Sequence, residues 1–426
     1  MENLKYMKAS IKFSAGLLTV ALFLAALKGQ GQTPPVLSLD TVMQRIDRNN
    51  QQLQAYAYKA EGYRHSADAA TAWMPPMAGA GTFMTPYPFQ KVMDPAGKGS
   101  LMLRLEQDIP SLSRLKAKKT YIRSLGDIEK ASRSISLNDY KAQSKELYCR
   151  WVVALRQLKA LQENEQLLTM MKKIETVRYP YNQSDLSNIY RINAKLEENK
   201  SNILLLESEI ARSRAYLNTL MNRPATELFT VDSSYQPMFV AVTPDTARLA
   251  EARGDILKTD ATIQAMQNNI AAMQQEKKPA YKIQFDHMSS FSSSTPQAFS
   301  IMGMISIPIA PWASKMYKSE AKAMELNIRS METERSAMLQ EAQGMLNGLQ
   351  YEIQALQRKT EALEAKIIPS LQQAQAIKFL QYQENKAALP EVIDAWEAVN
   401  MLRSELWDQK LKLYQMIVEY EKELYK

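Results

Sequence analysis

Apolar residues recur every three or four positions along most of the chain, which is the spacing that places side chains on one face of an α-helix. From Ile192 to Leu220 the steps between successive apolar residues are four, seven, three, four, seven and three. The segments from Leu147 to Leu158 and from Val392 to Leu406 carry similar stripes. This pattern predicts long amphipathic helices that pack as coiled coils, with the apolar residues forming a core rather than a cofactor site.

The same order of predicted helices and strands occurs twice along the chain, which indicates an internal duplication. The expected organisation is a first repeat at 33–224, a linker at 225–245 and a second repeat at 246–426. The expected elements are a helix at 39–73, strands at 77–109 and helices at 112–177 and 185–221, then a helix at 246–278, strands at 280–309 and helices at 312–380 and 386–425. At ~1.5 Å per residue, the segment 112–177 would form a helix about 100 Å long.

Two classes of residue alternate in the segments between the helices. In the segment 100–109, leucines at every second position alternate with charged residues. Segments 281–288 and 299–309 alternate in a similar way, whereas 77–85 is rich in glycine and alanine. Strands with one apolar and one polar face are typical of membrane barrels, and they also occur in any half-buried soluble sheet.

The first residues favour the membrane interpretation. Lys5, Lys8 and Lys12 precede an apolar run from Phe13 to Leu27. This arrangement is typical of a secretory signal peptide, and we expect one at 1–32. A single-pass anchor is the alternative, but the run is shorter than the roughly 20 residues that span a bilayer. An exported chain without a longer apolar run would enter a membrane only through its strands.

The number of strands predicts an oligomer. Four strands from one chain leave open edges, which lipid does not tolerate, so several copies would contribute to one barrel. Trp73 and Trp312 stand at the junctions between helices and strands. Because tryptophan is enriched at membrane–water interfaces, these two residues are the expected interface girdle.

Composition and charge argue against several other functions. The formal net charge is +8, but basic residues are interleaved with acidic ones, which does not indicate nucleic-acid binding. Cys149 falls within an apolar helical pattern and is interpreted as a core residue. His65 and His287 lack metal-ligand spacing, and no phosphate loop or nucleophile motif occurs. We therefore predict no enzyme activity, no cofactor and no metal site, although the 24 methionines fit either soft-metal ligands or core filler.

Several motifs resemble the outer membrane efflux protein family, that of TolC-like channels and their drug- and heavy-metal-efflux relatives. The residues that carry the resemblance are Leu39–Val42 with Asn49–Asn50, Leu217–Pro224, and Ile367–Pro369 with Tyr382 and Leu389–Ala395. The resemblance covers the chain from about Leu37 to Lys426. The family usually has a glycine in each helical break, at 178–184 and 381–385 in this chain, where Asn182 and Asn385 tolerate positive φ instead.

The resemblance implies a mostly α fold with membrane β-structure. Duplicated long helical hairpins would form a periplasmic α-barrel, and four strands per protomer would complete a 12-stranded outer-membrane β-barrel in a homotrimer. The implied function is a passive exit duct of a tripartite efflux pump or a type I secretion system. The implied partners are a periplasmic adaptor (membrane fusion) protein, an inner-membrane pump and outer-membrane lipid.

A periplasmic coiled-coil adaptor or scaffold is the alternative function. Adaptors usually carry one helical hairpin, whereas this chain has two hairpins and two strand pairs. That difference favours the channel.

The resemblance also assigns candidate site residues. Glu391 and Asp394 lie three residues apart and therefore share a helix face. Acidic residues at this place line the closed aperture in several relatives, where threefold rings of charge would select for cations; the alternative is that they complement the helix dipole. The implied adaptor contacts, which are otherwise solvated turns, are Tyr179, Asn182, Ser184, Asp185, Tyr382 and Asn385.

Overall fold

A computed structural model describes residues 34–243, 245–308 and 311–425, together with the backbone of every helix and strand named below. The expected signal peptide at 1–32 lies outside the described residues. The described chain forms two compact units, which do not coincide with the two sequence repeats. The first contains 150–219, 223–235 and the residues before 43; the second contains 43–149, 220–222 and everything from 236 onward.

The first unit is a helical hairpin with a small parallel strand pair. Its helices are the second part of α4 (Leu112–Arg178) and α5 (Leu186–Leu220), joined by the 3₁₀ turn η3 (Tyr179–Tyr181). Strands β1 (Val36–Leu37) and β4 (Thr230–Val231) pair in parallel. The hairpin core is apolar, with Trp151, Leu168, Met171, Ile192 and Leu217 all buried.

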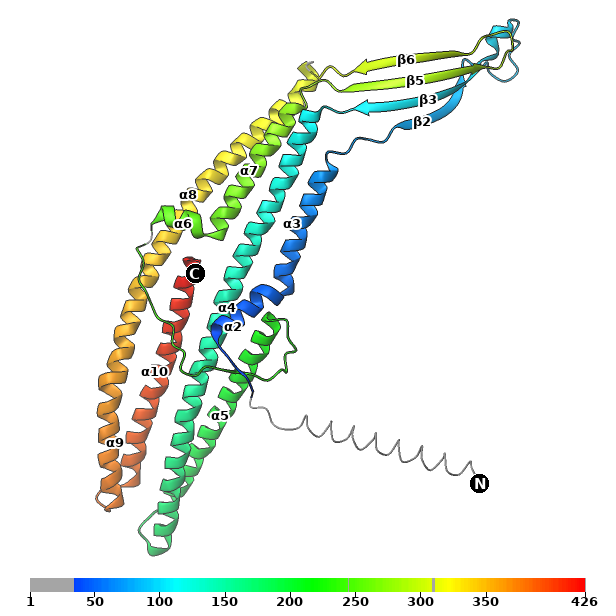
Figure 1. The fold of residues 1–426 in the computed structure, drawn as a ribbon. Coiled ribbons are helices and arrows are strands. Elements are labelled where there is room, and N and C mark those ends of the chain that lie inside the picture. The colour runs from blue at the N-terminus through cyan, green and yellow to red at the C-terminus, as the bar shows by residue number, and fades with distance from the viewer. Residues whose placement is uncertain (1–33, 244, 309–310, 426) are drawn as a thin grey trace, which may run out of the picture. The chain divides into compact units, whose positions relative to one another are not determined.

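The second unit contains the sheet and the remaining helices. The helices are the second part of α2 (Leu39–Asn49), α3 (Gln51–Ala69), the first part of α4, α6 (Thr246–Ala252), α7 (Gly254–Gln275), α8 (Pro311–Ala362), α9 (Ile368–Gln383) and α10 (Leu389–Glu423). The strands are β2 (Met77–Phe83), β3 (Ser100–Ile109), β5 (Tyr281–Ser290) and β6 (Ala298–Ile305), with a 3₁₀ turn η2 (Pro95–Lys98) before β3. Helices α3, α4, α7 and α8 all meet one end of the sheet (Figure 1). Long helical hairpins with four strands per chain confirm the predicted mostly α fold with a four-stranded β contribution from each chain.

The sheet has the order β2-β3-β5-β6, and all neighbouring strands are antiparallel. The central pair β3–β5 joins the two sequence repeats, with Leu105 opposite Phe285. Strands β2 and β6 are the edges. Strand β6 ends at Ile305, short of the predicted 309, because its partner strand β5 begins at Tyr281, the residue opposite Ile305.

The helices predicted at 39–73 and 246–278 are each divided in the structure. Asn50 has extended backbone (φ −65°, ψ 122°), and its side-chain oxygen accepts hydrogen bonds from the amides of Gln52 and Leu53. Asn50 is therefore the N-cap of a new helix, α3. In the second repeat Arg253 is extended in the same way (φ −74°, ψ 120°) and separates α6 from α7. The continuous helices predicted there are wrong, because an extended residue interrupts the helical hydrogen bonds.

The helix predicted at 312–380 is also interrupted. A π-helical turn, η4 (Leu363–Ile367), separates α8 from α9. Pro369 lies in the first turn of α9 and has no backbone N–H to donate to the carbonyl of Ala365, four residues earlier, so the backbone widens into a π turn. Leu363, Ile368 and Leu406 pack together around this turn.

Among the described residues, no helix combines the length and the apolar character that crossing a membrane requires.

Candidate functional site

One face of the sheet is apolar and exposed. On β3, the side chains of Leu101, Leu103 and Leu105 are 40–50% exposed, and on β6 Phe299 and Ile301 are 69% and 68% exposed. The β5 residues that share this face, Tyr281, Ile283 and Phe285, are also exposed. No helix or loop of the described chain buries this face. Its exposure is the reverse of what a soluble half-buried sheet requires.

The opposite face is polar and internally paired. Arg104 Nε donates to Asp286 Oδ1 at 2.8 Å, and Lys282 Nζ lies 2.6 Å from Glu106 Oε2. Gln284 also donates to Asp286 at 2.7 Å. The side chains of Gln284 and Asp286 are among the most buried of the sheet, at 6% and 5% exposed. Polar groups lie inside and apolar groups outside, as in membrane strands whose inner face meets water.

The turn between α4 and α5 is closed without glycine. Asn182 adopts the left-handed conformation (φ 57°), the Asn182 amide donates to Tyr179 O at 3.1 Å, and the Gln183 amide donates to Arg178 O at 3.2 Å. These two bonds are a Schellman motif. Ser184 donates from its hydroxyl to the buried Glu175 carboxylate.

The turn between α9 and α10 repeats this geometry. Asn385 is left-handed (φ 58°), its amide donates to Tyr382 O at 3.1 Å, and the Lys386 amide donates to Gln381 O at 2.7 Å. Asparagine, which tolerates positive φ, therefore supplies the conformation that glycine would otherwise provide. Pro390 lies in the first turn of α10, where its missing N–H costs no helical hydrogen bond.

The predicted contact residues of the two turns differ in accessibility. Tyr179 is 44% exposed, and Asn182, Asp185 and Asn385 are also exposed. Asp185 accepts a hydrogen bond from the Ser187 amide at 3.0 Å, so it caps α5. Tyr181, at 74% exposed, lies in the same predicted contact segment, 178–187, two residues after Tyr179.

Tyr382 is buried, at 2% exposed, with its ring 6.3 Å from that of Phe379. This position does not support the prediction that Tyr382 contacts an adaptor, because its side chain packs inside the α9–α10 hairpin instead of lying on the surface.

The two predicted aperture acids have different environments. Both are exposed on α10, while the intervening Val392 and Ile393 are buried. Glu391 Oε2 lies 2.6 Å from Lys378 Nζ of α9. This hydrogen bond and a second one from the backbone N–H of Ala388 hold the pKa of Glu391 below its usual range. Because Ala388 is the N-cap residue, Glu391 completes half of a capping box. Among the described residues, Asp394 has no ion pair or side-chain hydrogen bond.

Of the two tryptophans predicted to form the interface girdle, the structure describes the side chain of Trp73. Trp73 is exposed, at 54%, and lies between α3 and β2. Trp312 lies in the first turn of α8, and its side chain is outside the described part of the structure.

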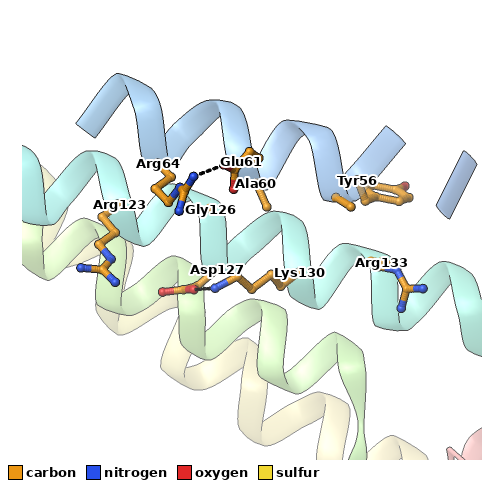
Figure 2. A pocket seen from close by; sticks show the side chains of 10 residues that line it. Tyr56, Ala60, Glu61, Arg64, Arg123, Gly126, Asp127, Lys130 and Arg133 are labelled. Atoms are coloured by element: carbon orange, nitrogen blue, oxygen red, sulfur yellow. Dashed lines mark hydrogen bonds and ion pairs between the residues drawn. The ribbon is translucent and has the colours of Figure 1, made fainter. Parts of the chain in front are cut away.

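A cavity of about 340 Å³ lies between α3 and α4. Ala57, Ala60 and Gly126 contribute to its wall, and among its charged residues Arg64 pairs with Glu61 and Lys130 with Asp127 (Figure 2). The cavity contains none of the residues predicted as sites.

The cysteine and histidine side chains that could serve as nucleophiles or metal ligands do not cluster in the described part of the structure. Cys149 is fully buried, and burial raises the pKa of its thiol to about 12, which fits a core residue. His65 lies beside Glu61 on α3. Within the described residues, no three His, Cys, Asp or Glu side chains are placed to hold a metal ion.

Comparisons with known proteins show which solved structures share this fold. No family model and no curated protein matches this sequence. The solved outer-membrane channel OprN is similar over 91% of this chain and 89% of its own, with a TM-score of 0.72 and 15% identity. The CmeC outer-membrane channel of Campylobacter jejuni matches 91% of this chain and 85% of its own (TM-score 0.71, 14% identity). The MtrE outer-membrane channel of Neisseria gonorrhoeae, solved in its open state, matches 91% and 88% (TM-score 0.70, 17% identity). The chain therefore has the fold of these outer-membrane channels.

Proposed function

We propose that this chain is one protomer of an outer-membrane channel, which serves as the passive exit duct of a tripartite efflux pump or a type I secretion system. The observation that carries the proposal is the inverted sheet: Ile301 and its apolar neighbours are exposed, while Arg104 and Asp286 pair on the opposite face. Such a sheet is stable when lipid covers its apolar face and water fills the space on the other side.

The channel is a homotrimer in this proposal. Strands β2 and β6 each have one unpaired edge, and such edges are not stable in lipid. Pairing β6 of one copy with β2 of the next removes every edge, and three copies of the four-stranded sheet give 12 strands. A barrel of that size is wide enough to hold a water-filled lumen.

The helical hairpins extend into the periplasm and meet an adaptor protein at their turns. Exposed tyrosines at the α4–α5 turn, Tyr179 and Tyr181, support this role, because tyrosine is enriched at protein interfaces. Asn182 and Asp185 are accessible on the same turn, and Asn385 is accessible on the α9–α10 turn, whereas Ser184 and Tyr382 support their turns. The adaptor connects the channel to an inner-membrane pump, which supplies the energy, so the channel itself is no enzyme.

Asp394 is the stronger candidate for a charged ring at the aperture. Its carboxylate is exposed and makes no bond to the described chain, whereas Glu391 is held by Lys378. Three copies of a free carboxylate at a constriction attract cations and repel one another.

The test is to express the full chain, separate the membranes, and size the protein in detergent before measuring conductance in planar bilayers. We expect outer-membrane localisation, a trimer and discrete cation-preferring channels. A soluble monomer in the periplasmic fraction would contradict the proposal. An Asp394→Asn variant is expected to lose part of the cation preference, with Asp408→Asn, farther along α10, as the control.

A further inference from the structure

The loop between β2 and β3, residues 84–99, carries four large apolar side chains that are strongly exposed. Phe89 is 105% exposed, Met93 97%, Tyr87 82% and Met84 79%. These values are higher than those of the residues on the apolar face of the sheet, and the four side chains are close together in the sequence. Large apolar side chains concentrated and exposed in one short segment are typical of a surface that contacts a partner or a membrane.

The backbone of this loop is held in an unfavourable conformation. Met84 (φ 52°) and Phe89 (φ 72°) both adopt the left-handed region, which residues with large side chains rarely occupy. The Gln90 amide donates to Tyr87 O at 3.1 Å and closes the turn that presents Phe89. This turn therefore presents Phe89 in a backbone conformation that residues of its size rarely adopt, and such outliers cluster at functional segments.

The base of the loop is also well defined. Gly99 has φ +81°, and a Cβ atom added there would lie 2.7 Å from Thr85 Cα, so only glycine fits. The Phe291 amide of the neighbouring loop donates to Gly99 O at 3.0 Å. The two loops are therefore tied together at the end of the sheet remote from the helices (Figure 1).

The neighbouring loop, between β5 and β6, has the opposite character. It contains a run of serines, in which Ser292 is buried and its hydroxyl lies 2.8 Å from that of Ser294. Among its residues, all of which the structure describes, Phe291 is the one exposed aromatic side chain. Apolar exposure is thus a property of the β2–β3 loop and does not follow simply from its place at the end of the sheet.

Lipid is the occupant that fits this loop. The loop continues directly into β3, whose exposed leucines begin at Leu101, so its apolar surface extends the face that the proposed function assigns to lipid. Tyrosine and phenylalanine are favoured where hydrocarbon meets headgroups. Lys91 and Lys98 are exposed on the same loop and have the charge that acidic headgroups require.

We propose that the β2–β3 loop is a lipid-binding arm that inserts Tyr87, Phe89 and Met93 into the outer leaflet and places Lys91 and Lys98 on acidic headgroups. This inference rests on the proposed channel function, because it takes the sheet to be in the membrane. A second copy of the chain is the competing occupant.

The test introduces an indole by Phe89→Trp and reconstitutes the trimer in vesicles of phosphatidylcholine with phosphatidylglycerol. Lipids brominated near the headgroup quench an indole that lies among them, and the parent protein gives the signal of the native tryptophans to subtract. Ser293→Trp, on the exposed part of the serine-rich loop, is the matched control. We expect quenching at position 89 to be about twofold stronger than at 293.

A second pair of variants tests the charge. Lys91→Gln with Lys98→Gln, in the Phe89→Trp background, should abolish any dependence of the quenching on phosphatidylglycerol. Intact conductance with an indole at 89 that bromine does not quench would overturn the lipid arm while leaving the channel in place. A blue-shifted, unquenched indole would assign the loop to a second copy. Loss of trimer and conductance in the parent protein would instead overturn the proposed function and this inference with it.

Discussion

Arg253 donates from its guanidinium to the backbone carbonyl of Glu423 at 3.1 Å and pairs with the Glu423 carboxylate at 2.7 Å. Asn50 makes the equivalent connection in the first repeat, where its amide donates to the carbonyl of Leu220 at 3.0 Å. Both donors stand at a helix break, and both acceptors lie at the end of the last helix of the same repeat, 170 residues away. In each repeat, the residue at the helix break is therefore hydrogen-bonded to the end of the last helix of that repeat.

The first prediction is that Arg253 contributes more to the free energy of unfolding than Asn50 does. Arg253→Met removes a cation whose side chain is only 10% exposed and leaves the carboxylates of Asp255 and Glu423 without it. Breaking a buried ion pair costs about 3–5 kcal/mol. Asn50→Ala removes a helix cap, which costs about 1 kcal/mol. Denaturant unfolding followed by circular dichroism should separate the two variants, and equal destabilisation would show that the Arg253 pair is not buried in the assembled protein.

A second prediction concerns the pair Lys378–Glu391. Lys378→Gln leaves the Glu391 carboxylate uncompensated, so the negative charge at this turn increases in every copy. We expect a higher resting conductance and a stronger cation preference in planar bilayers, and the reverse shift in preference for Glu391→Gln. Lys386→Gln is the control, because Lys386 pairs with Glu384 at 2.7 Å in the same turn. If Lys378→Gln behaves like this control, Glu391 does not face the conducting path.

The pH dependence of the same pair has a definite sign. Folding lowers the pKa of Glu391 below its ordinary 4.5, chiefly through the bond from Lys378. A carboxyl with a depressed pKa stabilises the folded state above its unfolded-state pKa, and this contribution is lost as pH falls through the folded-state value. The contribution of Glu391 to the ion preference of the parent channel should therefore persist at pH 4.5 and be lost only at lower pH. In Lys378→Gln the added cation preference should titrate nearer pH 4.5. Single-channel reversal potentials across this range measure both.

A third prediction compares two neighbouring residues on β6. Ile301, 68% exposed, lies on the apolar face, and Met302, 47% exposed, lies on the polar face. Arginine facing the middle of a bilayer costs about 2–4 kcal/mol, whereas a lumen position tolerates it. Ile301→Arg should therefore reduce trimer yield and stability in membranes far more than Met302→Arg does. A soluble sheet would accept arginine at the exposed Ile301 without loss, and that result would contradict a lipid-facing surface.

Strand β3 is the element that sequence reasoning predicts best. Its alternation specifies both bounds and both faces, because a shift of one residue would move Leu103 from the apolar face to the face of Arg104. The breaks at Asn50 and Arg253 are harder to foresee. The apolar stripe continues through them, and what holds each extended residue in place is a partner 170 residues away.

The candidate site shows the same division. The left-handed conformation of Asn182 and Asn385 follows from local chemistry, since asparagine tolerates positive φ. The ion pair of Glu391 with Lys378 joins two helices across the turn. The spacing of residues along α10 alone does not predict this pair.

The last prediction concerns Tyr179 and Tyr382, which hold the same position in the two Schellman turns. Tyr382 is 2% exposed and packs by Phe379, whereas Tyr179 is 44% exposed. Tyr382→Ala should leave a cavity and cost about 3 kcal/mol, while Tyr179→Ala should change stability by less than about 0.5 kcal/mol. Hydrogen exchange at the amides of Asn385 and Lys386 measures the second turn, because both amides donate within it.

Exchange at the matching amides of Asn182 and Gln183 provides the internal comparison for the first turn. Faster exchange at 385–386 in Tyr382→Ala, with no change at 182–183 in Tyr179→Ala, would mean that one tyrosine supports its turn while the other is free to meet a partner. If both variants loosen their turns equally, Tyr179 is also structural. The contact surface proposed for the adaptor would then have to rest on Tyr181, whose side chain is 74% exposed.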